Sequence, residues 1–290
     1  MPTLKEKTML VQLSISQWYN RTADNSVSVE VCQSKKASSG VGRYIKKLLP
    51  DEAFNSINRC IRQIRNDHAK LTLPWQDGNI RILPAVLFLD YKKLISEGER
   101  ALEEALWDFH KNFDLWKNGA KKELGSLFNE QDYPNPDDII KNFIVKTHFL
   151  PFPDTTDFRV DINEAAMAQL REETNEFIHG LVVASTLNLF NSLLLIVLKA
   201  KLAVDGYVEG RTFHSNTLLA PLVEANRVTK MNVTGAPYVN EFAHEVQETF
   251  ARVDPQQLRE NHHLLMQRQK DISALYSRWE LFCETGSKAN

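Results

Sequence analysis

The chain has 290 residues, of which 43% are apolar and 25% are charged, and its formal net charge is -2. This composition is typical of a globular protein with a substantial core, and it excludes a low-complexity or intrinsically disordered chain. The three cysteines, Cys32, Cys60 and Cys283, stand far apart and outside any metal-ligand spacing, which argues against a disulfide framework and a cysteine-rich zinc site.

The first residues predict a half-buried strand. Between Met9 and Trp18, the apolar Val11, Leu13 and Ile15 alternate with polar side chains, which is the period of a strand. This stretch also lacks the apolar core of a signal peptide. Together with the unpaired cysteines, it leads us to expect a cytoplasmic protein.

Residues 35–70 form a basic segment. Nine cations and three anions give it a net charge of +6, which leaves -8 for the rest of the chain. Such an imbalance attracts nucleic acid or an acidic partner, although a solvated face that is balanced by acidic surface elsewhere produces the same pattern. The candidate nucleic-acid-binding or anion-binding residues are Lys35, Lys36, Arg43, Tyr44, Lys46, Lys47, Arg59 and Arg62, and the tyrosine ring is able to stack on a base.

Part of the basic segment, residues 51–68, predicts an amphipathic helix. Its apolar residues recur at steps of three and four, and they are Phe54, Ile57, Ile61 and Ile64. At about 100° per residue, Arg59 and Arg62 fall on the polar face, whereas Arg65 lies nearer the apolar edge.

Residues 71–84 predict a short β-hairpin. Asp77 and Gly78 supply the residue types of a tight turn between two apolar stretches. Because Pro74 and Pro84 have no amide hydrogen, they favour an edge position in the sheet.

A first long helix is predicted from Pro84 to Asn129. Its apolar residues approach a heptad seam, and charged residues occupy the other faces. The seam comprises Leu87, Tyr91, Leu94, Leu102, Ala105, Phe109, Phe113, Trp116, Ala120, Leu124 and Leu127. Pro134 and Pro136 stand beyond its end.

A second long helix is predicted after an extended link at residues 143–162, in which residues 158–162 alternate as in a strand. Asp161 and Glu164 match a capping box at its start, and Gly206 stands as the stop signal after Val204. Residues 181–198 of this helix carry no charge and approach the ~20 residues that cross a bilayer. Serine, threonine and asparagine interrupt the stretch, so we expect a helix buried on most sides in the protein core.

Three further helices are predicted around residues 218–228, 238–253 and 255–282. The expected fold is therefore mainly α with a small β-sheet, a bundle of long helices with a short N-terminal sheet or hairpin. We expect an N-terminal α/β subdomain at residues 1–83 and a helical bundle at residues 84–290, packed as one unit.

No familiar catalytic motif is present. The stretch SSGVGRYIKK fits neither a Walker loop nor a dinucleotide-binding loop, so Gly40 and Gly42 indicate a turn, whose amides are still able to hold an anion beside Arg43. The eight histidines have no metal-ligand spacing. We therefore predict no catalytic residue, no metal site and no cofactor.

Four stretches follow one another along the chain: LVQLSISQWYNR near the start, LTLPWQDGNIRILP before the first long helix, FRVDI before the second, and RTFHSNTLLAPLVEANR after it. Their order resembles an uncharacterised family of tailed-phage and mobile-element proteins, and the resemblance spans most of the chain. That family is known as a domain of unknown function, sometimes encoded near MoxR-type AAA+ ATPases. The resemblance implies an accessory or adaptor protein that acts with such an ATPase or in phage DNA metabolism.

Three functions remain open from the sequence. The first is a non-enzymatic scaffold or adaptor that binds a protein partner or a second copy of itself, indicated by the near-heptad seam and by Trp107 and Trp116. The alternative to self-association is that the apolar stripes of both long helices pack inside the core of a monomer. The second function is nucleic-acid binding through residues 35–65, and the third is an enzyme whose site leaves no linear trace. We expect no membrane partner.

Overall fold

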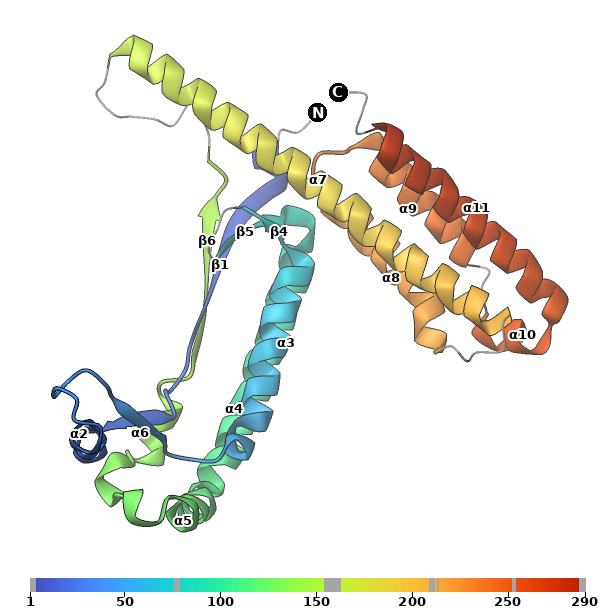
Figure 1. Ribbon diagram of the computed structural model, residues 1–290. Helices are drawn as coiled ribbons and strands as arrows, with labels where there is room; N and C mark the ends of the chain where they lie inside the picture. The colour runs from blue at the N-terminus through green and yellow to red at the C-terminus, as the bar shows by residue number, and fades with distance from the viewer. Residues whose placement is uncertain are drawn as a thin grey trace. The chain divides into compact units, whose positions relative to one another are not determined.

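A computed structural model describes residues 4–75, 79–153, 163–208, 212, 214–251 and 254–286 (Figure 1). Helices dominate these residues and strands form a small part of them, which confirms the predicted fold class, mainly α with a small β-sheet. The chain divides into two compact units. Unit 1 comprises residues 1–11, 71–88 and 149–290, and unit 2 comprises residues 12–70 and 89–148. Each unit is thus assembled from separate stretches, whereas the sequence analysis placed one boundary after residue 83.

The larger sheet of the described residues has four strands in the order β4-β5-β1-β6. They are β1 (Thr8–Ser16), β4 (Leu73–Pro74), β5 (Ile80–Pro84) and β6 (Ile144–Pro151). Strands β4 and β5 pair antiparallel, with Leu73 opposite Ile82. These strands confirm the predicted N-terminal strand, both arms of the hairpin and the extended start of the link. The predicted turn at Asp77 and Gly78 and the alternating stretch at residues 158–162 lie outside the described residues.

A second, smaller sheet belongs to unit 2. It pairs β2 (Arg21–Asp24) antiparallel with β3 (Tyr44–Lys47), and Arg21 lies opposite Lys47. Between these strands stands α2 (Asn25–Ser34), which Asp24 caps by accepting a hydrogen bond from the amide of Val27. The basic segment therefore begins at the end of a short helix and enters a strand.

Helices α3 (Asn55–Leu71) and α4 (Phe88–Lys111) pack side by side in antiparallel directions (Figure 1). A short 3-10 helix, η1 (Asp51–Phe54), leads into α3. The contacts between the pair run in opposite sequence order, and they join Phe54 with Phe109, Cys60 with Ala101, Ile64 with Gly98, and His68 with Tyr91. Ile57, Ile61 and Ile64 are all buried, as the helical spacing predicts.

The first long helix is shorter than predicted. The turn η2 (Ala85–Leu87) precedes α4, and α4 ends at Lys111, after which α5 (Phe113–Leu124) begins. The break is at Asn112, whose side-chain amide donates to the carbonyl of Asp108 and whose backbone leaves the helical region. Asparagine competes with the helix in this way, and the apolar periodicity alone does not show it. Short helices η3 (Gly125–Leu127), η4 (Glu130–Asp132) and α6 (Pro136–Ile140) follow.

Unit 1 contains the remaining helices. They are α1 (Leu4–Lys7), α7 (Glu164–Val208), α8 (Ser215–Met231), α9 (Pro237–Phe250), α10 (Pro255–Glu260) and α11 (His262–Gly286). Helix α7 packs against α8 and α11, and α8 packs against α9. Phe190 of α7, Phe242 of α9 and Trp279 of α11 meet in the core, with the rings of Phe242 and Trp279 stacked 4.8 Å apart. This aromatic cluster ties three helices together.

Two helix ends in unit 1 differ from the sequence prediction. Helix α7 continues through the buried Gly206 to Val208, because a glycine inside a helix costs only about 1 kcal/mol. The last predicted helix is interrupted at Asn261, which is extended and accepts a hydrogen bond from the amide of Leu264 as α11 begins. At the start of α7, Asn163 accepts a hydrogen bond from the amide of Ala166, whereas Asp161 of the predicted capping box lies outside the described residues.

Candidate functional site

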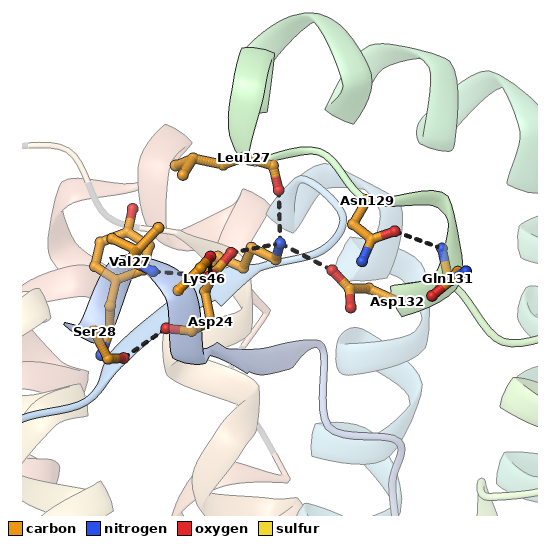
Figure 2. Close-up of polar contacts among 10 residues, drawn as sticks. Asp24, Val27, Ser28, Lys46, Leu127, Asn129, Gln131 and Asp132 are labelled. Carbon is orange, nitrogen blue, oxygen red and sulfur yellow. Dashed lines mark hydrogen bonds and ion pairs between the residues drawn. The ribbon is translucent and has the colours of Figure 1, made fainter. Parts of the chain in front are cut away.

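The ammonium group of Lys46 is the centre of a buried polar cluster in unit 2. Its Nζ lies 2.9 Å from Oδ2 of Asp24, 2.9 Å from Oδ2 of Asp132 and 2.6 Å from the carbonyl oxygen of Leu127 (Figure 2). Lys46 is 5% exposed. The ammonium therefore donates hydrogen bonds to Asp24 and Leu127 and forms ion pairs with both aspartates.

Residues next to Asp24 in the sequence stabilise its ionised carboxylate. Its carboxylate accepts hydrogen bonds from the hydroxyl of Ser26, from Lys46 and from the amide of Val27, and these hold its pKa well below the usual range. Burial alone would lower the pKa of Lys46, but the hydrogen bonds with Asp132 and Asp24 raise it above its ordinary value. The lysine stays charged and the carboxylate of Asp24 stays ionised.

The cluster joins the β2–β3 sheet to residues 125–132, and this role is structural. Lys46 was one of the sequence-derived candidates for binding an anion, but its charge is already matched by two carboxylates. An external phosphate would have to compete with both of them for the same ammonium. Lys46 is therefore not an available contact for nucleic acid.

The other candidates in the basic segment lie in two places. Lys35, Lys36, Arg43 and Tyr44 are exposed on the stretch from the end of α2 to the start of β3. Lys47 is also exposed but forms an ion pair with Asp51, with 2.7 Å between Nζ and Oδ2. Arg59 and Arg62 lie on the exposed face of α3.

A cavity of about 460 Å³ beside β3 is poorly suited to an anion. Tyr44, Lys46 and Lys47 line it, but so do three carboxylates, those of Asp51, Glu52 and Glu123. Because these carboxylates repel a phosphate, the exposed face of α3 is the more suitable place for an anion to bind. Residues that were not among the candidates from the sequence complete this surface: Asn55, Asn58 and Arg65 of α3, and Gln17, which follows β1.

Helix α7 carries an exposed apolar row, which we call the α7 face. It comprises the exposed Ala184, Leu187, Leu195 and Leu202, the half-buried Leu198 and one polar residue, Asn191, at steps of three and four. The side chains of Leu187, Leu195 and Leu202 are 48%, 51% and 58% exposed. The prediction that residues 181–198 are buried on most sides is therefore wrong, because only 33% of the most apolar window of α7 is buried. The helices α8 and α11 cover one side of α7 and leave the α7 face open to solvent in the described residues.

Within the part of the chain that the structure describes, α7 is the one helix whose length and composition would let it cross a membrane. A helix that packs in the core of a soluble protein passes the same criterion. The finding is compatible with a soluble protein.

A third polar region lies between α9 and α11, where a cavity of about 670 Å³ has a charged lining. Its charges pair with each other: Arg268 lies 2.9 Å from Asp271, and Arg278 forms an ion pair with Glu245. Glu245 also accepts a hydrogen bond from the indole of Trp279. No histidine lines this cavity among the described residues. Nor do the described residues bring three metal-ligating side chains together.

Comparison with protein-family models, with curated proteins and with solved structures finds no match to this chain. The function must therefore be argued from the surfaces described above.

Proposed function

We propose that this chain is a non-enzymatic interaction protein that associates with a second copy of itself through the α7 face. The observation that carries the proposal is the row of half-exposed leucines on α7. Apolar side chains at steps of three and four on one side of a helix are the pattern of helix–helix packing. A contiguous apolar row in water marks an interaction surface more often than scattered exposed residues do.

The proposal moves the self-association surface from the first long helix to the second. Much of the predicted seam is buried inside unit 2, since Tyr91, Leu102 and Phe109 of α4 are buried, whereas Trp107 outside the seam is 58% exposed. The α7 row, in contrast, presents three leucines that are 48–58% exposed and lie at helical spacing. A twofold arrangement would place the same face on both copies, as most homodimers do.

Burial of the α7 face supports only a weak dimer. A fully buried leucine contributes roughly 1.5–3 kcal/mol, so each of the three half-exposed leucines contributes about 1 kcal/mol, or on the order of 6 kcal/mol for two copies. Association itself costs on the order of 4–15 kcal/mol of translational and rotational freedom. We therefore expect a dimer that forms as the protein concentration rises.

A second copy fits the α7 face better than a membrane does. The side of α7 that packs on α8 carries Ser192, which donates to Glu224, and Glu224 pairs with Arg227. Near the other end of the face, Lys201 and Asp205 form an ion pair. Each ionised group would cost about 2.5–3.5 kcal/mol at the centre of a bilayer. These charges favour a protein in aqueous solution, and we propose the cytoplasm.

Analytical ultracentrifugation over a concentration series tests the proposal. The parent protein should shift from monomer to dimer, and Leu195→Glu should remain monomeric because removing an ionised carboxylate from water into the packed face costs free energy. Val223→Glu on α8 is the matched control, because Val223 is exposed but lies outside the α7 face, and it should dimerise as the parent does. A parent that stays monomeric, a control that dissociates equally, or co-sedimentation with lipid vesicles in place of dimerisation would overturn the proposal.

The resemblance to phage and mobile-element proteins adds a second layer to this proposal. We propose that the associated protein acts as an accessory of an AAA+ ATPase or of phage DNA metabolism, because that family is sometimes encoded near such ATPases. Affinity capture from the native host cell, with identification of the bound proteins, tests this. The expected result is an AAA+ ATPase that Leu195→Glu recovers in smaller amount, and capture of no ATPase would contradict it.

A further inference from the structure

The solvent-facing side of α3 carries cations and amides without a carboxylate. Its exposed residues include Asn55, Asn58, Arg59, Arg62, Arg65 and Asn66. At about 100° per residue these six lie within an arc of about 120°. The one acidic residue of α3, Asp67, is buried, and its carboxylate accepts hydrogen bonds from Gln63.

A shallow cavity of about 310 Å³ lies on this surface. Gln17, which directly follows β1, lines it together with Asn55, Asn58, Ile61, Arg62 and Arg65 of α3. The two charged side chains of the lining are those of Arg62 and Arg65, which lie about one turn apart on α3. The cavity is therefore a polar, positively charged recess, and it belongs entirely to unit 2.

The arginines of this surface differ from Lys46, Lys47 and Lys70 of the basic segment in having no acidic partner among the described residues. Lys46 and Lys47 form ion pairs with aspartates. No ion pair joins Arg59, Arg62 or Arg65 to a carboxylate of the described residues. Their charges are available to an external anion, and an arginine is suited to bind one because its planar guanidinium forms two parallel hydrogen bonds with a phosphate.

We propose that the exposed side of α3 binds double-stranded nucleic acid. Arg59, Arg62 and Arg65 contact backbone phosphates, and the neighbouring amides of Asn55 and Asn58 contact further phosphates or base edges. Six residues of a helix rise about 9 Å, which lets arginines 59 and 65 reach different phosphates of one strand. A major groove about 12 Å wide admits a helix of this size. The arc holds no aromatic side chain on which an unpaired base would stack, which favours a duplex over a single strand.

The amides distinguish a nucleic acid from an acidic polypeptide. The side-chain carboxylates of an acidic peptide only accept hydrogen bonds, so they would use the arginines and the NH2 half of each amide. Base edges present donors and acceptors together, and asparagine and glutamine match both. Gln17, Asn55 and Asn58 beside two arginines therefore fit a duplex more completely.

Fluorescence anisotropy with a labelled DNA duplex at low salt tests the proposal with the full-length chain. Affinity should fall with salt at about -0.9 per phosphate contacted, which gives a slope near -3 for three arginines. Arg62→Gln should bind several-fold more weakly and reduce the slope by about one, because one phosphate contact is lost. Asn58→Glu, which adds a negative charge to the recess, should weaken binding at least as much.

Arg100→Gln is the matched control. Arg100 is exposed on α4 of the same unit, so the variant makes the same change in charge away from the arc. It should bind the duplex as the parent does, and unchanged circular dichroism spectra should confirm that all variants are folded. The proposal is overturned by absence of duplex binding at low salt, by equal loss in Arg100→Gln, by tighter binding of the single strand, or by equally strong competition from polyglutamate.

Discussion

Replacing Gly98 with alanine tests the close approach of α3 to α4. A Cβ atom at Gly98 would lie 2.5 Å from Cγ1 and 3.4 Å from Cδ1 of Ile64. Carbon atoms pack best at about 3.5–4.0 Å, and Ile64 is 1% exposed, so the branch of its side chain has little room to retreat. Overpacking of this kind costs about 1–3 kcal/mol, whereas alanine gains about 1 kcal/mol over glycine inside a helix. We expect Gly98→Ala to lower the free energy of unfolding by about 1 kcal/mol.

Gly119→Ala in α5 is the matched control, because a Cβ atom there meets nothing within 4 Å. This variant should gain about 1 kcal/mol, so the two alanine variants should differ by about 2 kcal/mol. Urea unfolding followed by circular dichroism measures the difference, provided that the slopes with denaturant agree. In an Ile64→Ala background, Gly98→Ala should cease to destabilise. If Gly98→Ala stabilises the parent as much as Gly119→Ala does, the reasoning about the α3–α4 contact is refuted.

The buried Lys46 and the partly buried Glu224–Arg227 ion pair give the remaining predictions. Lys46→Met removes the ammonium that two carboxylates share, so the free energy of unfolding in urea titrations should fall by about 1–3 kcal/mol. Lys47→Met, at an exposed ion pair, should change it by less than about 0.5 kcal/mol. Equal effects of the two variants would contradict the structural role of Lys46. Burial would raise the pKa of Glu224, but hydrogen bonds from Arg227 and Ser192 outweigh burial and hold it below the ordinary 4.5. Because the pKa is lower in the folded than in the unfolded protein, this stabilisation is complete above about pH 4.5 and is lost as the pH falls through the lowered folded-state value. Glu224→Gln should therefore lose less stability than the parent on acidification from about pH 6 to about pH 3, and an identical loss in both proteins would argue against the assignment.

Local periodicity was sufficient to predict most helices and strands. The spacing of Ile57, Ile61 and Ile64 marks the buried side of α3, and the alternation around Leu13 marks β1. The interruptions at Asn112 and Asn261 were missed because each depends on a hydrogen bond of a polar residue within an otherwise helical pattern. Apolar spacing reports which face is buried, and it carries no information on such competing bonds.

Surroundings that are distant in sequence decided the outcome for the candidate site. From the sequence, the charge of Lys46 is expected to be available to an anion. Its partner Asp132 is 86 positions away along the chain and comes close to it only in the folded unit. Conversely, the helical spacing predicts Arg65 at the edge of the apolar face. In the structure it lines a polar recess together with Gln17, the residue after β1. Strand alternation in β3, where Lys46 is the buried position, is the local signal that would have found the first of these.

The apolar stretch of α7 illustrates a related limit. Its composition shows that the helix avoids water somewhere along its length, but the number of helices packed around it is set by the positions of α8 and α11. Leu193 and Leu195 have the same chemistry, and the first is fully buried while the second is half exposed. Hydropathy averages these two positions together.

The interleaved course of the chain through the two units constrains how this protein can be taken apart. A fragment that ends at residue 83 would contain β1, β4 and β5 but lack β6, and it would contain α3 without the α4 surface that covers its isoleucines. A fragment that starts at residue 84 would contain β6 without β1, and α4 without α3. Truncation there would therefore separate the strands of the larger sheet and uncover the isoleucines of α3, and point substitutions in the full-length chain are the means of testing the proposed surfaces on α7 and α3 separately.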